Sequence, residues 1–222
     1  GGARAAEALG SDAGASLMAM NEVITSDLSA LLCPPLTGTP LDIGEVLASA
    51  CPMPTHRFLQ AFSGEASAPH GPPAEVKPAL EALSRAAGRG SATAVRSSGT
   101  RAGGGSVLSA YAVLRGASLL DVAPVRGDLL DRLGGAVAWR PHGLDLRHSA
   151  APLRSAPKSV HVSALVNWKR TGQVIGSVAE TARKKYNSGM FVHWYHRNGF
   201  GPGDFEHAFE TLETVVSDYN AA

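Results

Sequence analysis

Cysteine, charge of one sign and long apolar runs are all scarce in this 222-residue sequence. The two cysteines, Cys33 and Cys51, form no CxxC pair, so we predict reduced thiols rather than a disulfide framework or a metal site. The formal net charge is +1 with both signs mixed, which argues against a nucleic-acid surface or a polybasic membrane patch. No apolar run reaches the ~18 residues that span a bilayer, and no signal peptide is recognisable, so we expect an intracellular protein without a membrane partner.

What the sequence does contain is apolar residues, 44% of the total, enough for one large or two small domains. Leu17, Met20, Ile24, Leu28 and Leu31 recur at helical spacing before two prolines, which predicts a long helix. Further helices are predicted over residues 43–50, 73–87, 121–133, 172–188 and 204–219. Gly88 is expected to end the second of these, and residues 88–105 have the composition of a linker.

Strands are predicted where apolar, β-branched or aromatic residues alternate or run together: residues 55–62, 106–116, 136–141 and 158–168. Pro141 marks the third as an edge strand, because proline cannot donate a backbone hydrogen bond. Residues 63–73 and 143–157 are rich in small and polar residues and are expected to be loops. The glycines at 103–105 lead into a strand and no Gly-Lys-Ser/Thr follows, so they do not form a phosphate-binding loop.

This order of elements predicts an α/β fold with a small mixed sheet flanked by helices. A long core helix precedes the sheet, and a pair of helices follows it. We divide the chain into a flexible start with the core helix (residues 1–34), an intermediate α/β domain (35–168) and a C-terminal helical hairpin (169–222).

The most distinctive stretch lies near the end, where residues 190–196 read Met-Phe-Val-His-Trp-Tyr-His. A polar turn follows, and then a helix with one apolar face made of Phe205, Phe209, Leu212, Val216 and Tyr219. Asp204 is expected to cap this helix or to lie in its first turn. Burying each of these apolar residues is worth ~1.5–3 kcal/mol, so we expect the helix to pack on the rest of the chain.

This ending resembles the carboxy-terminal end of the tubulins. Cys51-Pro52-Met53-Pro54 after the short helix, and the strand that ends in Leu114-Arg115-Gly116, are similar to the delta-tubulin family in particular. Trp194 instead matches the alpha and beta form, since delta-tubulins often have Gln there. The resemblance extends from about residue 16 onwards, and it implies the intermediate and C-terminal domains of a tubulin-superfamily protein.

The resemblance implies a cytoplasmic, cytoskeletal protein of centrioles and basal bodies that acts in forming or maintaining triplet microtubules. Its partners would be other tubulin subunits and centriolar proteins. GTP with magnesium is implied for the full-length family member, in which the nucleotide-binding half lies upstream of the core helix. No cofactor-binding residue is therefore assigned within this chain. Because the sequence begins with Gly1 rather than Met, we expect a fragment or a processed form.

Glu45 falls where alpha-tubulin has the acid that acts on the nucleotide of the neighbouring subunit. The resemblance thus implies that Glu45 is catalytic in trans. A carboxylate can orient a water or take its proton for attack on a terminal phosphate, provided that the other subunit supplies phosphate and magnesium. A solvated residue in a first helical turn fits the same position. The implied interface residues are Asp42, Trp194, Phe205 and Phe209.

Three alternatives stay open. The chain fits a tubulin-derived module that binds proteins without nucleotide, and it also fits another minor tubulin. An unrelated small enzyme would need a deep pocket that gathers His193, His196 and an acid. These two histidines are too few for a closed metal site, so no metal is assigned. The sequence contains neither a Ser-His-Asp order nor a dinucleotide fingerprint.

Overall fold

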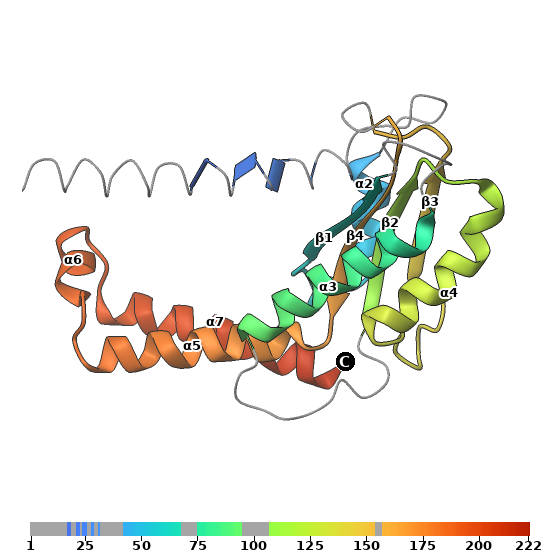
Figure 1. Cartoon of the computed structure of the whole chain (residues 1–222). Coiled ribbons are helices and arrows are strands. Elements are labelled where there is room, and N and C mark those ends of the chain that lie inside the picture. The colour runs from blue at the N-terminus through green and yellow to red at the C-terminus, as the bar shows by residue number, and fades with distance from the viewer. Residues whose placement is uncertain are drawn as a thin grey trace, which may run out of the picture.

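The computed structural model describes residues 42–67, 75–94, 107–153 and 157–222, together with single helical positions between residues 17 and 31. Side chains in the second range are described up to residue 87. The chain forms a small mixed sheet flanked by helices and ends in a pair of helices (Figure 1). This arrangement confirms the predicted fold class. The division into three domains stays a prediction.

The sheet has four strands in the order β1-β4-β2-β3. They are β1 (Gln60–Ser67), β2 (Val107–Arg115), β3 (Leu144–Ser149) and β4 (Ser159–Trp168). The last strand, β4, lies between β1 and β2 and is antiparallel to both, whereas β2 and β3 are parallel. All nine residues of β2 are buried, and so are nine of the ten in β4. The apolar run of β2 and the alternating Val160, Val162 and Ala164 of β4 are the signals that predicted these two strands.

Helices cover both faces of the sheet. On one face lie α3 (Val76–Ala94) and α4 (Val122–Leu133), the latter entered through the short turn η1 (Leu119–Asp121). On the other face lies α2 (Ile43–Ala50), whose Val46 and Ala50 pack with Tyr111 and Val113 of β2. Successive residues of β2 point to opposite faces, so this strand contributes to both cores.

The predicted core helix is helical at each position that the structure describes between residues 17 and 31. Leu31 is buried against α2, whereas Leu17, Ile24 and Leu28 are exposed. Met20, the remaining member of the predicted apolar face, lies outside the described residues. Within this chain, the described part of that face is therefore buried only at Leu31.

The C-terminal hairpin consists of α5 (Thr171–Asn187), the short α6 (Val192–Arg197) and α7 (Pro202–Ala221). Figure 1 shows α5 and α7 side by side, with α6 at the end far from the sheet. The predicted helices over residues 172–188 and 204–219 are thus confirmed. Gly201 is the N-cap residue of α7, and Asp204 lies in the first turn, where its Oδ2 accepts a hydrogen bond of 2.7 Å from the Gly201 amide.

Tyr219 fastens the end of α7 to the sheet. Its buried hydroxyl accepts a 3.0 Å hydrogen bond from the Phe58 amide and donates one of 3.0 Å to Oδ1 of Asn167 on β4. Asn167 in turn donates from Nδ2 to the His56 carbonyl at 2.7 Å. Burial raises the pKa of the Tyr219 phenol, which keeps its proton in place for donation. The predicted packing of the terminal helix on the chain is confirmed.

One predicted strand is displaced along the chain, and another is wrong. The strand expected over residues 55–62 begins only at Gln60 and runs through part of the expected loop to Ser67, where pairing with β4 compensates for a sequence of small and polar residues. The edge strand expected over residues 136–141 is reduced to a single bridge between Ala136 and Val107. Pairing with a neighbouring strand, rather than apolar alternation, decided both outcomes.

Two other boundaries also differ from the predictions. The expected loop over residues 143–157 contains β3, which pairs with β2 although its sequence, Leu-Asp-Leu-Arg-His-Ser, is mostly polar. As an edge strand, β3 keeps part of its surface in solvent and tolerates charged residues. Gly88 does not end α3, which continues through Gly88 and Gly90 to Ala94, because a glycine within a helix costs only about 1 kcal/mol relative to alanine. Residues 95–105 of the predicted linker lie outside the described residues.

A methyl group at Gly64 is expected to destabilise the fold. At this position β1 touches α3 so closely that a Cβ would overlap the Ala79 carbonyl oxygen and the Leu83 backbone nitrogen. Backbone atoms cannot rotate away, so Gly64→Ala should lower the free energy of unfolding by ~1–3 kcal/mol in urea titrations. Gly127→Ala in α4 is the matched control, because nothing lies within 4 Å of its Cβ position and alanine favours the helix. Equal stabilities of the two variants would contradict this close approach.

Removing the Tyr219 hydroxyl should loosen α7. Tyr219→Phe leaves the Phe58 amide and the Asn167 Oδ1 without their partner, which costs ~1–3 kcal/mol of unfolding free energy. Tyr195→Phe, at an exposed ring on α6, should change the stability by about 0.5 kcal/mol or less. Both values can be measured by thermal and urea unfolding. If Tyr219→Phe were as stable as the parent chain, the hydroxyl would not hold the helix.

Candidate functional site

The candidate site begins at the N-terminal end of α2. Asp42 is the N-cap residue of this helix, and its Oδ1 accepts a 2.8 Å hydrogen bond from the Gly44 amide. The carboxylate thereby satisfies one of the amides that a helix start leaves without a partner. Asp42, an implied interface residue, thus has a local role in fixing the first turn that carries Glu45.

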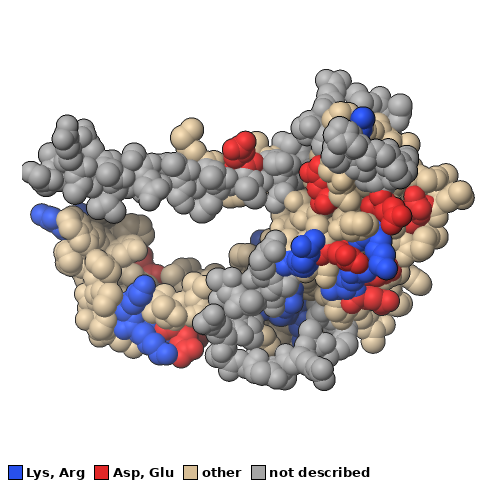
Figure 2. Space-filling view, in the orientation of Figure 1, with Lys and Arg blue, Asp and Glu red and all other residues tan. Residues whose placement is uncertain are grey.

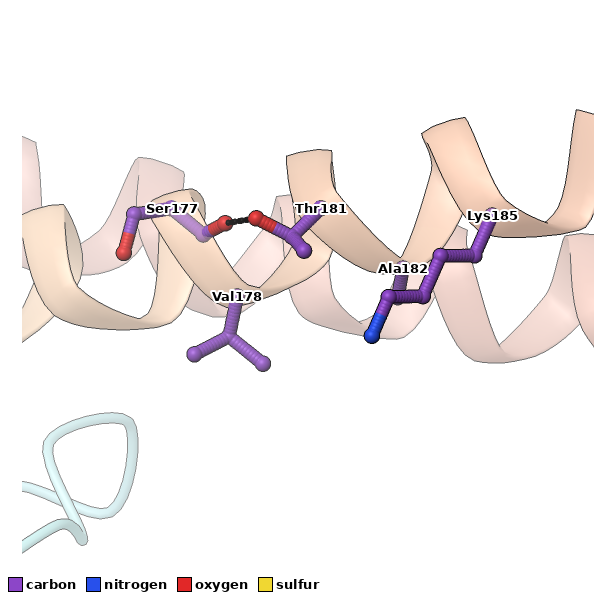
Figure 3. Close-up of a pocket in the computed structure, with 5 residues that line it drawn as sticks. All are labelled: Ser177, Val178, Thr181, Ala182 and Lys185. Atoms are coloured by element: carbon purple, nitrogen blue, oxygen red, sulfur yellow. Dashed lines mark hydrogen bonds between the residues drawn. The ribbon is translucent and has the colours of Figure 1, made fainter.

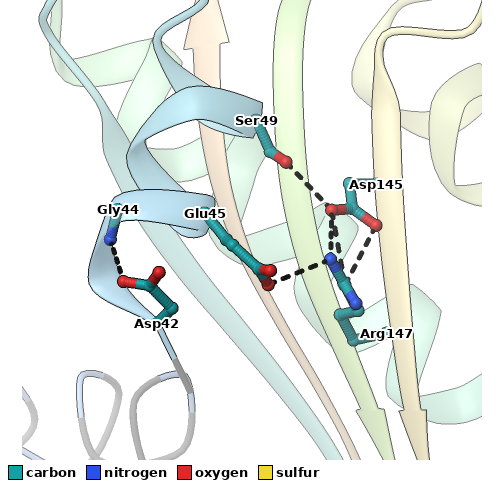
Figure 4. A network of polar contacts seen from close by, with 6 residues as sticks. All are labelled: Asp42, Gly44, Glu45, Ser49, Asp145 and Arg147. Carbon is teal, nitrogen blue, oxygen red and sulfur yellow. Dashed lines mark hydrogen bonds and ion pairs between the residues drawn. The ribbon is translucent and has the colours of Figure 1, made fainter. Parts of the chain in front are cut away.

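Glu45 extends from that first turn over the neighbouring strand β3. Its side chain is 64% exposed, and its Oε2 lies 3.6 Å from Nη2 of Arg147. Arg147 also contacts Asp145, with 3.3 Å between Nε and Oδ1, and Ser49 of α2 donates a 2.9 Å hydrogen bond to Oδ2 of Asp145. Figure 4 shows these side chains converging from α2 and β3. We call Glu45, Ser49, Asp145 and Arg147 the α2–β3 network.

The uncharged side chain of Tyr111 belongs to the surroundings of this network. Tyr111 of β2 is paired in register with Asp145 and is buried. Burial is the main factor that raises the pKa of the Tyr111 phenol, while Arg147 lowers it and Asp145 raises it. The phenol therefore keeps its proton, and the charges that act on it come from the α2–β3 network and from the buried Arg115 of β2.

Glu45 was predicted from the sequence, whereas Ser49, Asp145 and Arg147 were not. Asp145 and Arg147 were assigned to a polar loop, and only the parallel pairing of β3 with β2 brings them beside α2. Their alternation with Leu144 and Leu146 was the one signal of a strand available in the sequence.

Among the residues that the structure describes, no cluster of three or more His, Cys, Asp or Glu side chains has the arrangement of a metal site. In the α2–β3 network, a guanidinium lies between the carboxylates of Glu45 and Asp145. This arrangement does not fit a magnesium site built from this chain alone.

Phe205 and Phe209, two of the implied interface residues, lie inside the C-terminal hairpin. Phe209 is only 5% exposed, and its ring lies 5.8 Å from that of Tyr186 and 4.4 Å from the guanidinium of Arg183. Phe205 stacks on Tyr186 at 4.5 Å. Both phenylalanines therefore hold α5 and α7 together within the chain.

Trp194, in contrast, is 54% exposed on α6. It belongs to an apolar group that we call the hairpin tip, which consists of Met190, Phe191, Trp194, Tyr195 and Phe200, all exposed. Phe191 has a left-handed backbone with φ of 64°, which is unfavourable for a residue with a side chain. Figure 2 shows the α6 end of the molecule as largely uncharged, whereas acidic and basic side chains mix over the sheet side.

Two shallow pockets lie elsewhere. One, of about 310 Å³, is lined by Ser177, Val178, Thr181, Ala182 and Lys185. All five come from α5, and Val178 and Lys185 extend from the same side of this helix (Figure 3). The other, of about 420 Å³, lies at the start of α3 beside η1. His193 and His196 line neither pocket, and both are exposed on α6. The pocket that a histidine-based enzyme would require is therefore not one of these two.

The different environments of Phe209 and Trp194 should appear in their stability. Phe209→Ala removes a buried ring and should lower the unfolding free energy by ~3–5 kcal/mol. Trp194→Ala removes an exposed ring and should change it by about 0.5 kcal/mol or less. Circular dichroism during thermal unfolding can compare the two variants. A large loss for Trp194→Ala would mean that the hairpin tip packs within the chain.

Within the described ranges, each helix is too short or too polar to cross a bilayer. In comparisons with known proteins, no family model and no curated sequence matches the chain.

Proposed function

We propose that this chain is the second half of a tubulin-superfamily subunit of the delta type, and that it acts at a contact between subunits. In this proposal the subunit serves in forming or maintaining the triplet microtubules of centrioles and basal bodies. The GTP and its magnesium ion are bound by residues outside this chain. Glu45 acts on the nucleotide of the neighbouring subunit.

The fold supports this proposal. A helix that leads to α2, a small mixed sheet with helices on both faces and a C-terminal pair of helices agree with the order of elements that the resemblance implies. The Cys-Pro-Met-Pro motif of the resemblance, residues 51–54, directly follows α2 and precedes β1. A match in one short motif is easily accidental. Agreement in the order of the main helices and strands is a stronger reason for the proposal.

The observation that carries the proposal is the exposure of Glu45 on α2. A buried carboxylate could not meet a nucleotide on another molecule, and a carboxylate within a metal cluster would serve its own chain. The capped first turn of α2 instead presents Glu45 at the surface, beside the strand that carries Arg147. This is the geometry that action in trans requires.

Glu45 acts in this proposal as a general base toward one water molecule. Its carboxylate accepts the proton of a water whose oxygen forms a bond to the γ-phosphorus of GTP. The bond from this phosphorus to the β,γ-bridging oxygen breaks, and GDP leaves with the bonding electrons. The products are GDP and inorganic phosphate, and the neighbouring subunit supplies the phosphate binding.

A second candidate function is a tubulin-derived module that binds another protein without nucleotide. The hairpin tip favours it, because five exposed apolar side chains are gathered around α6. Exposed apolar groups of this kind often mark protein contacts. Another minor tubulin remains an alternative to the delta type on the same fold, with Trp194 as the residue in its favour.

Substitution of Glu45 tests the proposal. In the full-length protein that contains these residues, Glu45→Gln should lower single-turnover GTP hydrolysis after subunit association by about a hundredfold or more. Folding should be unaffected, since the side chain is exposed. The reaction can be followed as phosphate release by a rapid-quench assay.

Glu81→Gln is the matched control, because it changes an exposed carboxylate on α3, which packs on the opposite face of the sheet. It should hydrolyse GTP at the parent rate. Full activity in Glu45→Gln would reject catalysis by Glu45. A full-length protein that binds no GTP at all would favour the module without nucleotide.

A further inference from the structure

The α2–β3 network ties Glu45 to a cation. Arg147 lies between two carboxylates, 3.6 Å from Glu45 and 3.3 Å from Asp145. The two helical residues Glu45 and Ser49 are one turn apart and both face β3 (Figure 4). The proposed catalytic carboxylate is therefore ion-paired while the chain is alone.

The two contacts of Arg147 are not equivalent. Asp145 takes both Nε and Nη2 of the guanidinium, and it is fixed in turn by Ser49. It is also the less exposed acid, at 29% against 64% for Glu45. The contact with Glu45 is longer than a hydrogen bond and lies in solvent, where ion pairs are weak. Glu45 is the partner that Arg147 can exchange.

The charges of the network limit which group could replace Glu45 as the partner of Arg147. Within the network, the two carboxylates of Glu45 and Asp145 lie beside the single guanidinium of Arg147. A terminal phosphate brought next to Glu45 would meet repulsion from these carboxylates. A guanidinium binds phosphate oxygens through several N–H groups at once, so Arg147 is suited to offset that repulsion.

We propose that Arg147 binds the terminal phosphate of the nucleotide that a neighbouring subunit brings to this face, and that it releases Glu45 as it does so. This inference rests on the proposed function. Asp145 and Ser49 hold the guanidinium in place during the exchange. The released carboxylate is then free to take the proton of the attacking water. Glu45 is thus held by an ion pair in the free subunit and becomes available when a triphosphate arrives.

The exchange predicts a preference in association that does not depend on hydrolysis. Full-length subunits can be loaded with GDP or with the non-hydrolysable analogue guanosine 5′-(β,γ-imido)triphosphate, and their association measured by sedimentation velocity. Arg147→Gln should weaken association about tenfold in the triphosphate state and by less than about twofold in the GDP state. Arg147→Lys should restore part of this difference, because it keeps the charge but not the fork of donors.

Glu45→Gln separates the two proposals. This variant should keep or strengthen association in the triphosphate state, because the competing carboxylate is gone, while it loses hydrolysis. Arg126→Gln removes an exposed arginine on α4 and serves as the control, with no change in either state. Thermal unfolding of each variant checks that it is folded, and Arg147→Lys replaces Arg147→Gln if the latter fails this check.

An equal loss for Arg147→Gln in the GDP and triphosphate states would overturn the inference, because Arg147 would then contact protein rather than phosphate. An unchanged association would overturn it as well. Full hydrolysis in Glu45→Gln, with a triphosphate-specific loss in Arg147→Gln, would reject the role of Glu45 and keep that of Arg147. Parent subunits that show no difference between the two nucleotide states would overturn both.

Discussion

The sheet depends on the burial of β2 and β4 on both of their faces. Val162, Ala164 and Val166 of β4 face α3 and α4 together with alternate residues of β2. Tyr111 and Val113 of β2 face α2 on the other side. Neither core can form without these strands, because each is one half of a layer against which helices pack. The position of α2, and with it the position of Glu45, follows from this arrangement.

The sequence predicted best those elements whose environment is the same along their length. Strand β2 is mostly apolar because both of its faces are buried, and β4 repeats apolar residues at alternate positions toward α3 and α4. Helix α7 shows a regular apolar face because one side packs on α5. β1 and β3 were missed or misplaced because they are edge strands, in which pairing with a neighbour outweighs weak local preferences. Gly64 even lowers the strand preference of β1, yet it is the residue that lets α3 approach.

The candidate site was predictable only in part, for the same reason. Glu45 was identified because it belongs to a local segment that resembles a known family. Its partner Arg147 comes from the edge strand β3, so only the sheet brings the two together. Phe209 and Trp194 could not be distinguished from sequence either, since both are large aromatic residues of the same region. Their difference comes from α5, which covers Phe209 and leaves Trp194 in solvent.

The hydrogen bonds of Tyr219 join positions 161 and 52 residues apart in the chain. During synthesis, Phe58 and Asn167 leave the ribosome before Tyr219 does, so their polar groups must wait for the last turn of α7. Contacts of such large sequence separation form late and slow folding. Until α7 has been made and has packed, a nascent chain leaves Leu108 and Val137 uncovered and the polar groups of Phe58 and Asn167 without the Tyr219 hydroxyl.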